Sequence, residues 1–259
     1  MRIAFVGAGR LASNLAPALQ QSGAEVVEVW SRTRASAEAL AAQLGCRAVW
    51  ERVEDICTTA DLYLLSVTDT VLPQIVARLH RHREHALFAH TAGSMGLSLF
   101  ADAGHDRGAV FYPMQTFSKG RQVDFQQVHF FIEAAAETDC RSLEELAQKL
   151  STHVHRSSSA SRRRLHLAAV FACNFVNHCC TLADDLLHEG DLDFSVMQPL
   201  LEETVAKLRE LPPAEAQTGP AVRHDNNVMG LHRAMLADRP DLQHLYTQLS
   251  HSIQRYAHD

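Results

Sequence analysis

The chain has 259 residues, of which 46% are hydrophobic and 21% charged, and its formal net charge at pH 7 is −6. This ordinary globular composition excludes a disordered, collagen-like or disulfide-stapled chain. The acidic excess disfavours a nucleic-acid-binding surface. The six cysteines include no Cys-x-x-Cys pair, so zinc-ribbon and thioredoxin-type sites have no support.

The amino-terminal residues predict a strand rather than a targeting segment. Residues 3–6 are continuously apolar, which leaves no room for a signal peptide before them. No apolar stretch reaches the roughly 18 residues that a membrane span needs, so we expect no such span. A cytoplasmic location with reduced thiols follows as the default expectation.

Residues 1–156 alternate between short apolar runs and helical patterns. Continuous apolar strands separated by helices predict an α/β fold with a doubly wound, mostly parallel sheet covered on both faces. The predicted strands are residues 3–6, 26–30, 48–49, 61–67, 86–90, 109–112, 128–133 and 152–155. The predicted helices between them are residues 11–19, 35–44, 71–79 and 141–150.

The pattern changes after the serine-rich residues 157–161. Only helical periodicity follows, in residues 165–182, 196–211, 231–236 and 242–256. We therefore predict a sheet domain of residues 1–156 and a smaller all-helical domain of residues 157–259. Because helical domains of this size often bury one face against a second subunit, we expect a homodimer formed through it.

A glycine-rich turn directly follows the first predicted strand. Its residues Gly7-Ala8-Gly9-Arg10-Leu11-Ala12 read Gly-x-Gly-x-x-Ala at the start of a helix. Gly7 allows the tight turn, and Gly9 lets a diphosphate approach the backbone. Exposed N–H groups of the first helical turn would then face the anion. The alternative is a glycine-rich turn without a ligand.

The end of the second predicted strand decides between NAD and NADP. NAD-binding folds place an acidic residue roughly 20 positions beyond the glycines, but Ser31, Arg32 and Thr33 occupy this region. Hydroxyl and guanidinium groups suit a 2′-phosphate, which predicts NADP(H), with Arg34 or Ser36 assisting. The alternative is that both arginines are solvated.

The loop after residues 61–67 is expected to pass beside the nicotinamide ribose. We expect Val67 and Thr68 to contact it, mainly through their backbone. Asp69 or Thr70 alternatively caps the following helix.

Five segments together carry a resemblance to one family. It covers essentially the whole chain and resembles NADP-dependent oxidoreductases that join a Rossmann-like domain to a C-terminal helical domain of unknown function. The chain is more distantly similar to pyrroline-5-carboxylate reductase and the 6-phosphogluconate dehydrogenase group. These relatives imply a helical domain that dimerises and closes over the nicotinamide. The segments are Gly7-Ala8-Gly9-Arg10, His90-Thr91-Ala92-Gly93-Ser94, Pro113-Met114-Gln115-Thr116-Phe117, residues 166–174 and residues 218–225.

One departure from the wider group affects the chemistry. Its β-hydroxyacid dehydrogenases carry a lysine four residues before an asparagine, whereas Val170 precedes Asn174 here. Lysine-assisted alcohol oxidation is therefore disfavoured, and imine reduction is less affected.

Two loops at the carboxyl ends of predicted strands are candidates for substrate binding. They offer Gly93 and Ser94 in one loop, and Gln115 and Thr116 in the other. His90 is a candidate proton donor, because an ordinary histidine pKa lies near 6.5. Alternatively, His90 only caps its strand and Gln115 only hydrogen-bonds to the backbone.

Polar residues on the long predicted helix are further candidates. His166 and Asn174 are eight positions apart, which in a regular helix places them on roughly one face. Because their neighbours are apolar, they need either a ligand or partners in the adjacent domain. We predict catalytic roles for His166, His90 and Asn174, with a purely structural role as the alternative.

Arginines at two places in the chain are candidates for binding an anionic ligand. The three arginines 162–164 lie at a helix start, where their positive charge is unfavourable to the helix dipole. A nearby anion would explain this placement, and so would exposure of the arginines to solvent. Arg223 is the most plausible carboxylate-binding residue of its turn. No histidine or cysteine group has recognisable metal-ligand spacing, so we predict no metal.

The leading hypothesis is an NADP(H)-dependent oxidoreductase that reduces a small carbonyl or imine, with His166 or His90 donating the proton. The alternative is a non-catalytic NADP-binding sensor or structural homodimer.

Overall fold

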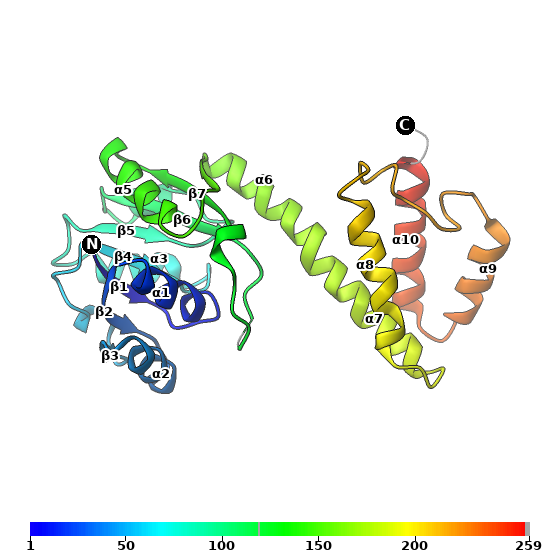
Figure 1. The fold of residues 1–259 in the computed structure, drawn as a ribbon, viewed down its shortest axis with the longest axis horizontal. Helices are drawn as coiled ribbons and strands as arrows, with labels where there is room; N and C mark the ends of the chain where they lie inside the picture. Colours follow the sequence, from blue (N-terminus) through cyan, green and yellow to red (C-terminus); the bar gives the residue numbers. More distant parts are fainter. Residues whose placement is uncertain (119, 257–259) are drawn as a thin grey trace. The chain divides into compact units, whose positions relative to one another are not determined.

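The computed structural model describes residues 1–118 and 120–256. The chain divides into two compact units, Met1–Asn177 and His178–Asp259. Figure 1 shows the helices and strands of each unit, coloured along the sequence.

A sheet of eight strands forms the centre of the first unit, with the order β3-β2-β1-β4-β5-β6-β7-β8. All neighbours are parallel except β6 and β7. The order of the first six strands is that of the Rossmann fold, which confirms the predicted fold class. The strands are β1 (Arg2–Val6), β2 (Glu25–Trp30), β3 (Arg47–Val49), β4 (Leu62–Leu65), β5 (Leu87–His90), β6 (Gly108–Met114), β7 (His129–Ala134) and β8 (Val154–Arg156).

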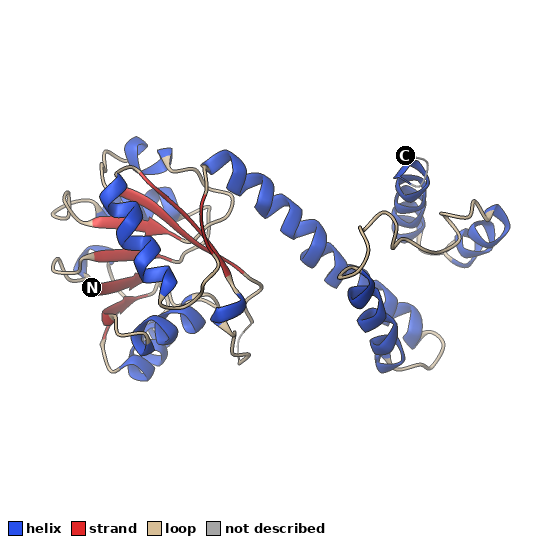
Figure 2. Ribbon diagram, turned by 45° about the horizontal axis from the view of Figure 1, so that its top comes forward, coloured by secondary structure: helices blue, strands red, loops and turns tan. Residues whose placement is uncertain are grey.

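Helices cover both faces of this sheet, as Figure 2 shows. One core cluster joins the sheet to α1 (Ala12–Gln21), α2 (Arg34–Leu44) and α5 (Glu137–Gln148). A second cluster joins the other face to α3 (Leu72–Leu79) and α4 (Ser98–Asp102). Short 3₁₀ turns lie at η1 (Val53–Asp55) and η2 (Phe125–Gln127).

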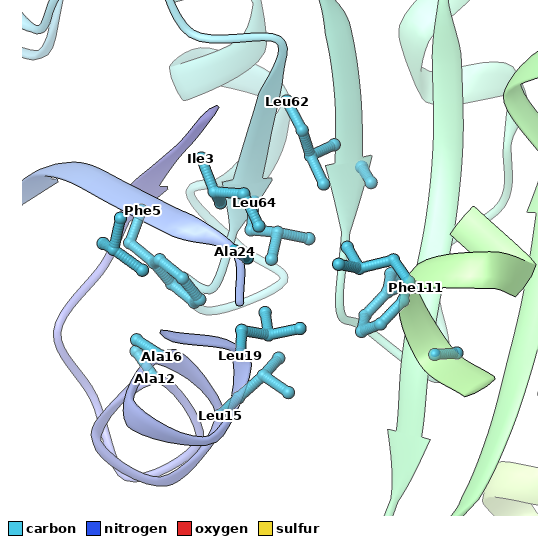
Figure 3. Packing of buried hydrophobic residues seen from close by; sticks show 14 of the residues in the cluster. Ile3, Phe5, Ala12, Leu15, Ala16, Leu19, Ala24, Leu62, Leu64 and Phe111 are labelled. Atoms are coloured by element: carbon cyan, nitrogen blue, oxygen red, sulfur yellow. The ribbon is translucent and has the colours of Figure 1, made fainter. Parts of the chain in front are cut away.

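Alternate residues of β1 point to opposite faces, as the two-residue period of a strand requires. Ile3 and Phe5 belong to the first cluster, and Ala4 and Val6 to the second. Figure 3 shows Leu15 and Leu19 of α1 beside the first cluster's strand residues. Residues 3–6 of this strand are therefore all apolar, which is why the sequence predicts it clearly.

A continuous helical stretch, Ser159–His188, begins three residues after β8. It comprises α6 (Ser159–Ala169), the π-helical turn η3 (Val170–Phe175) and α7 (Val176–His188). The division between the compact units falls inside it, after Asn177. The domain boundary expected at residue 156 coincides with the end of the sheet and stays a prediction.

This helical stretch is long and apolar enough, by length and composition, to cross a membrane. The expectation that no such stretch exists is wrong, because residues 165–182 contain no acidic residue, lysine or arginine. Uncharged polar side chains interrupt the apolar run, but the helix is still long and apolar enough to cross a membrane. The same composition fits a helix whose apolar face packs against another protein surface.

Within the described residues of the second unit, every regular element is a helix. The unit contains η4 (Phe194–Met197), α8 (Gln198–Lys207), α9 (Asn226–Met235) and α10 (Pro240–Tyr256). Helix α9 begins five residues before the predicted start at 231. The carboxylate of Asp225 accepts a hydrogen bond from the Val228 N–H at 3.1 Å and fixes that earlier beginning.

Candidate functional site

The glycine-rich turn leaves β1 at the carboxyl edge of the sheet. Gly7 has φ +118°, and a Cβ atom there would lie 2.2 Å from the Ser66 carbonyl oxygen, so only glycine fits. A Cβ at Gly9 would meet nothing within 4 Å. This open backbone, directly before α1, provides the close approach that a diphosphate needs.

The loop after β2 offers one uncommitted cation. Arg34 forms an ion pair with Glu38 at 2.8 Å and lies over the Trp50 ring at 4.6 Å. Arg32 is exposed and forms no ion pair within the described part of the chain. The Ser31 hydroxyl accepts a hydrogen bond from the Thr33 N–H at 3.3 Å. Of the two arginines, Arg32 is therefore the one without an ion-pair partner among the described residues.

A cavity of about 580 Å³ adjoins the glycine-rich turn. Its lining includes Ala8 of the glycine-rich turn, Asn14 of α1, Ser36 of α2, and Arg121 from the loop after β6. Motif spacing does not point to Arg121, because this residue lies far along the chain from the glycines.

The loops after β4 and β5 are tied together across the carboxyl edge. The Ser94 hydroxyl donates a hydrogen bond to the Asp69 carboxylate. Asp69 therefore does not cap α3, whose start is instead bonded through the Thr68 carbonyl. This link holds the expected ribose contacts, Val67 and Thr68, beside the loop that contains Gly93.

His90 ends β5 and is completely buried. Its Nδ1 accepts a hydrogen bond from the Ala92 N–H at 3.2 Å, and its ring stacks on Phe100. Burial, assisted by the positive charge of Arg162, lowers the pKa of His90 to about 3. The neutral, enclosed imidazole has the geometry of a structural residue, so it is the weaker candidate for proton donation.

His166 of α6 has a different environment, because its imidazole lies at the carboxyl edge of the sheet. Its Nδ1 lies 3.3 Å from the hydroxyl of Tyr112, near the end of β6. A Cβ at Gly93 would lie 2.7 Å from that nitrogen, so the β5 loop passes directly against the ring. His166 is only partly buried. Strand-end residues separated widely in sequence thus meet around one imidazole.

Arg162 does not contact solvent. It is completely buried, and its guanidinium forms an ion pair with Glu133 of β7 and donates to the Met95 carbonyl. The Ser159 N–H and hydroxyl also donate to Glu133, at 2.9 and 2.8 Å. The anion at this helix start is therefore a carboxylate of the protein. Arg163 and Arg164 are exposed.

The other predicted site residues lie in different surroundings. Gln115 is exposed, and its side-chain oxygen accepts a hydrogen bond from the Thr116 N–H at 2.8 Å. Asn174 is exposed within the π-helical turn, where the rotation per residue differs from a regular α-helix. The predicted alignment with His166 therefore does not follow from eight-residue spacing. Arg223 is exposed in the second unit, in the turn before α9.

Sequence reasoning missed Tyr112 and Glu133. Tyr112 directly precedes the Pro113-Met114-Gln115 segment, but in an apolar strand it looks like a core residue. Glu133 carried a usable signal, because a carboxylate in an otherwise apolar strand needs a partner.

Two family models match the chain. Residues 2–93 match the model described as NADP oxidoreductase, coenzyme F420-dependent, and residues 128–253 match a domain of unknown function, DUF2520. No curated protein sequence matches the chain.

A solved structure from Bacteroides fragilis, provisionally described as an NADP oxidoreductase, matches throughout. The two are 45% identical over 98% of each chain, with a TM-score of 0.93. The chain belongs to this NADP oxidoreductase family. The resemblance predicted from the sequence motifs is thereby confirmed, and the glycine-rich turn is part of a nicotinamide-dependent oxidoreductase fold.

More distant structures share the fold of this oxidoreductase. An imine reductase from Myxococcus stipitatus in complex with NADP⁺ is 18% identical, covers 98% of this chain and 93% of its own, and has a TM-score of 0.69. A pyrroline-5-carboxylate reductase from Coxiella burnetii is 14% identical, covers 98% and 96%, and has a TM-score of 0.59. The predicted distant similarity to the latter is confirmed at the level of the fold.

Proposed function

We propose that this oxidoreductase uses NADP(H) to reduce a small carbonyl or imine, with His166 delivering the proton. The observation that carries the proposal is the half-enclosed His166 imidazole, held against Gly93 at the sheet edge that also bears the glycine-rich turn. Ligands of open α/β sheets bind at this edge.

The described residues fit the cofactor. Open space above Gly9 suits the diphosphate, and the exposed Arg32 suits the 2′-phosphate. Val67 and Thr68 are the proposed neighbours of the nicotinamide ribose. The reduced nicotinamide, when bound, supplies the hydride. The protein's own contribution is to position the reactants and move the proton.

The substrate contacts follow from the same edge. The proposed substrate contacts of the first unit are Gly93, Ser94, Gln115 and Thr116. We also propose Arg223 as a substrate contact and Asn174 as a catalytic residue. The imine reductase in complex with NADP⁺ favours testing imines as well as carbonyls. A cytoplasmic location, with neither a membrane nor a nucleic acid as partner, is part of the same proposal.

A second copy of the chain is the proposed partner. Five residues of the described second unit are buried, namely Leu187, Ala221, Met229, Leu236 and Ser250. So small a core leaves a helical unit of this size short of apolar burial. Large apolar side chains are exposed on the helices instead, among them Leu167, Phe171, Leu200, Val205, Leu231 and Met235. A homodimer would cover them.

The deciding experiment has two parts. Titration with NADPH and NADH, followed by tryptophan emission, reports binding, because Trp30 ends β2 beside the proposed adenosine region. NADPH oxidation with a panel of small keto acids and cyclic imines then reports turnover. NADPH binding together with turnover that His166→Ala abolishes supports the proposal.

The same measurements would reveal the second candidate function. Val170 stands where the alcohol-oxidising relatives carry lysine, which favours a protein that holds NADP without chemistry. Tight NADPH binding without turnover on any tested substrate would support that sensor or structural role.

A further inference from the structure

The hydroxyl of Tyr112 forms a hydrogen-bonded pair with the imidazole of His166. The proposed function gives Tyr112 no role. The two rings meet edge to face, with centroids 6.2 Å apart and planes at 78°. The hydrogen bond joins the tyrosine oxygen to Nδ1. Tyr112 is 9% exposed, so the phenol is largely removed from water.

The protonation of this pair follows from its surroundings. Burial raises the pKa of Tyr112, so the phenol keeps its proton at neutral pH. Within the described residues, Nδ1 of His166 is the one hydrogen-bond partner of that hydroxyl. If Nδ1 carried the proton, the buried phenol would lack an acceptor for its own. The hydroxyl therefore donates to Nδ1, and the imidazole proton resides on Nε2.

Gly93 leaves Nε2 as the nitrogen available to a substrate. The β5 loop lies against Nδ1 and Cγ of His166, where a Cβ at Gly93 would come within 2.8 Å of both atoms. Tyr112 occupies the same nitrogen from β6. One side of the ring is thus closed by protein, and the Nε2–H remains to meet a reactant.

A neutral imidazole that gives up its Nε2 proton needs another at Nδ1. We propose that Tyr112 acts through His166 as the proton source of the reduction. As hydride adds to the substrate carbon, the substrate oxygen or nitrogen takes the Nε2 proton, and the tyrosine proton moves to Nδ1. The O–H bond of Tyr112 breaks, an N–H bond forms at Nδ1, and water later reprotonates the phenolate. This relay rests on the proposed function, which supplies the hydride from reduced nicotinamide.

Arg162 favours the phenolate that the relay creates. Its buried charge acts on Tyr112 and opposes the effect of burial on the phenol. Glu133, the ion-pair partner of Arg162, also accepts hydrogen bonds from Ser159. Strand β6 supplies Tyr112, strand β7 supplies Glu133, and helix α6 supplies both Arg162 and His166.

The first test needs no substrate. ¹⁵N NMR of His166 should show the Nε2-protonated tautomer in the wild-type protein and a mixture of tautomers in Tyr112→Phe. Tyr63→Phe is the matched control, because Tyr63 is a buried tyrosine whose hydroxyl bonds to the Cys57 carbonyl. It should leave the His166 signals unchanged. A wild-type tautomer protonated on Nδ1 would overturn the relay.

The second test is kinetic. Tyr112→Phe should lower kcat at least tenfold, within the range of general acid catalysis, while KM and NADPH affinity stay unchanged. If this variant folds poorly, replacing Tyr112 by the more acidic 3,5-difluorotyrosine preserves its shape. The high-pH loss of activity should then move to lower pH, which a merely structural tyrosine would not cause.

The outcomes separate the two proposals. Unchanged kcat in Tyr112→Phe, or an unmoved pH profile with difluorotyrosine, overturns the relay and leaves the reductase assignment intact. A protein with the expected tautomer that turns over no substrate contradicts the proposed function, and the relay falls with it.

Discussion

Arg162 and Glu133 form an ion pair in which the arginine side chain is fully buried and the glutamate side chain is 17% exposed. The pair joins the first turn of α6 to β7, so it fixes the direction in which the long helix leaves the sheet. The same helix carries His166 one turn later.

Breaking this pair should strongly destabilise the sheet unit. Glu133→Gln leaves a buried cation without its counter-ion, for which we expect a loss of about 3–5 kcal/mol in the free energy of unfolding. Urea unfolding measures the loss. Glu137→Gln, which disrupts the exposed pair with Arg156, is the control and should change little. If both substitutions lowered the free energy of unfolding equally, the prediction that the buried ion pair contributes more than the exposed one would be wrong.

The buried His90 predicts a pH dependence of stability. Its pKa of about 3 in the folded protein lies below the ordinary value of 6.5, so between these values the unfolded chain binds one more proton. Stability from this residue is complete above pH 6.5 and falls as pH decreases toward 3, by up to about 1.4 kcal/mol per pH unit. Urea unfolding across this range should show a shallower slope in a folded His90→Asn variant. His244→Asn, at an exposed position, is the control and should keep the wild-type slope. If His90→Asn also kept the wild-type slope, His90 would not be the residue responsible for the pH dependence.

Arg32 should determine the preference for NADPH. A charge-assisted hydrogen bond to phosphate contributes about 1.5–3 kcal/mol, so Arg32→Ala should weaken NADPH binding at least tenfold. NADH lacks the 2′-phosphate, and its affinity should stay unchanged. Tryptophan fluorescence titration measures both dissociation constants. Arg81→Ala, an exposed arginine after α3, is the control, and equal affinities for both cofactors in the wild type would remove the assignment.

Gly93 should tolerate no side chain, because an added Cβ would displace the His166 ring. Displacements of about 1 Å cost roughly a hundredfold in rate, so Gly93→Ala should lower kcat at least tenfold without unfolding the protein. Gly96→Ala is a control in the same loop, since its Cβ would meet ordinary contacts at 3.6 Å or more. Similar turnover in both variants would show that the Gly93 contact does not position His166.

The exposed apolar helices should mediate self-association. Phe171 is 62% exposed and Met235 is 77% exposed. A charge at either position would oppose burial against a second copy, so Phe171→Glu and Met235→Glu should shift a wild-type dimer toward monomer. Analytical ultracentrifugation measures the masses. A monomeric wild-type protein at micromolar concentration, with or without NADPH, would exclude the proposed partner.

Local sequence patterns predicted most of the fold. The central strands β1, β4, β5 and β6 are buried on both faces, so they are largely apolar runs that stand out in the sequence. The turn at Gly7 was equally clear, because its backbone conformation admits only glycine. Helix beginnings were less accurate: α5 starts at Glu137, four residues before the predicted 141, in an acidic first turn that favours a helix start.

The candidate site depended on contacts that span long sequence separations. Tyr112 and His166 are 54 residues apart, and Glu133 and Arg162 are 29 apart. The antiparallel pairing of β7 with β6 and the return of α6 to the sheet edge bring these side chains together. The sequence by itself determined the doubly wound sheet and its glycine-rich turn, because strand burial and turn geometry are encoded locally. Only the packing of distant segments shows that His90 is enclosed, that Arg162 pairs with a carboxylate and that His166 meets a tyrosine, because burial and charge pairing depend on which segments come together.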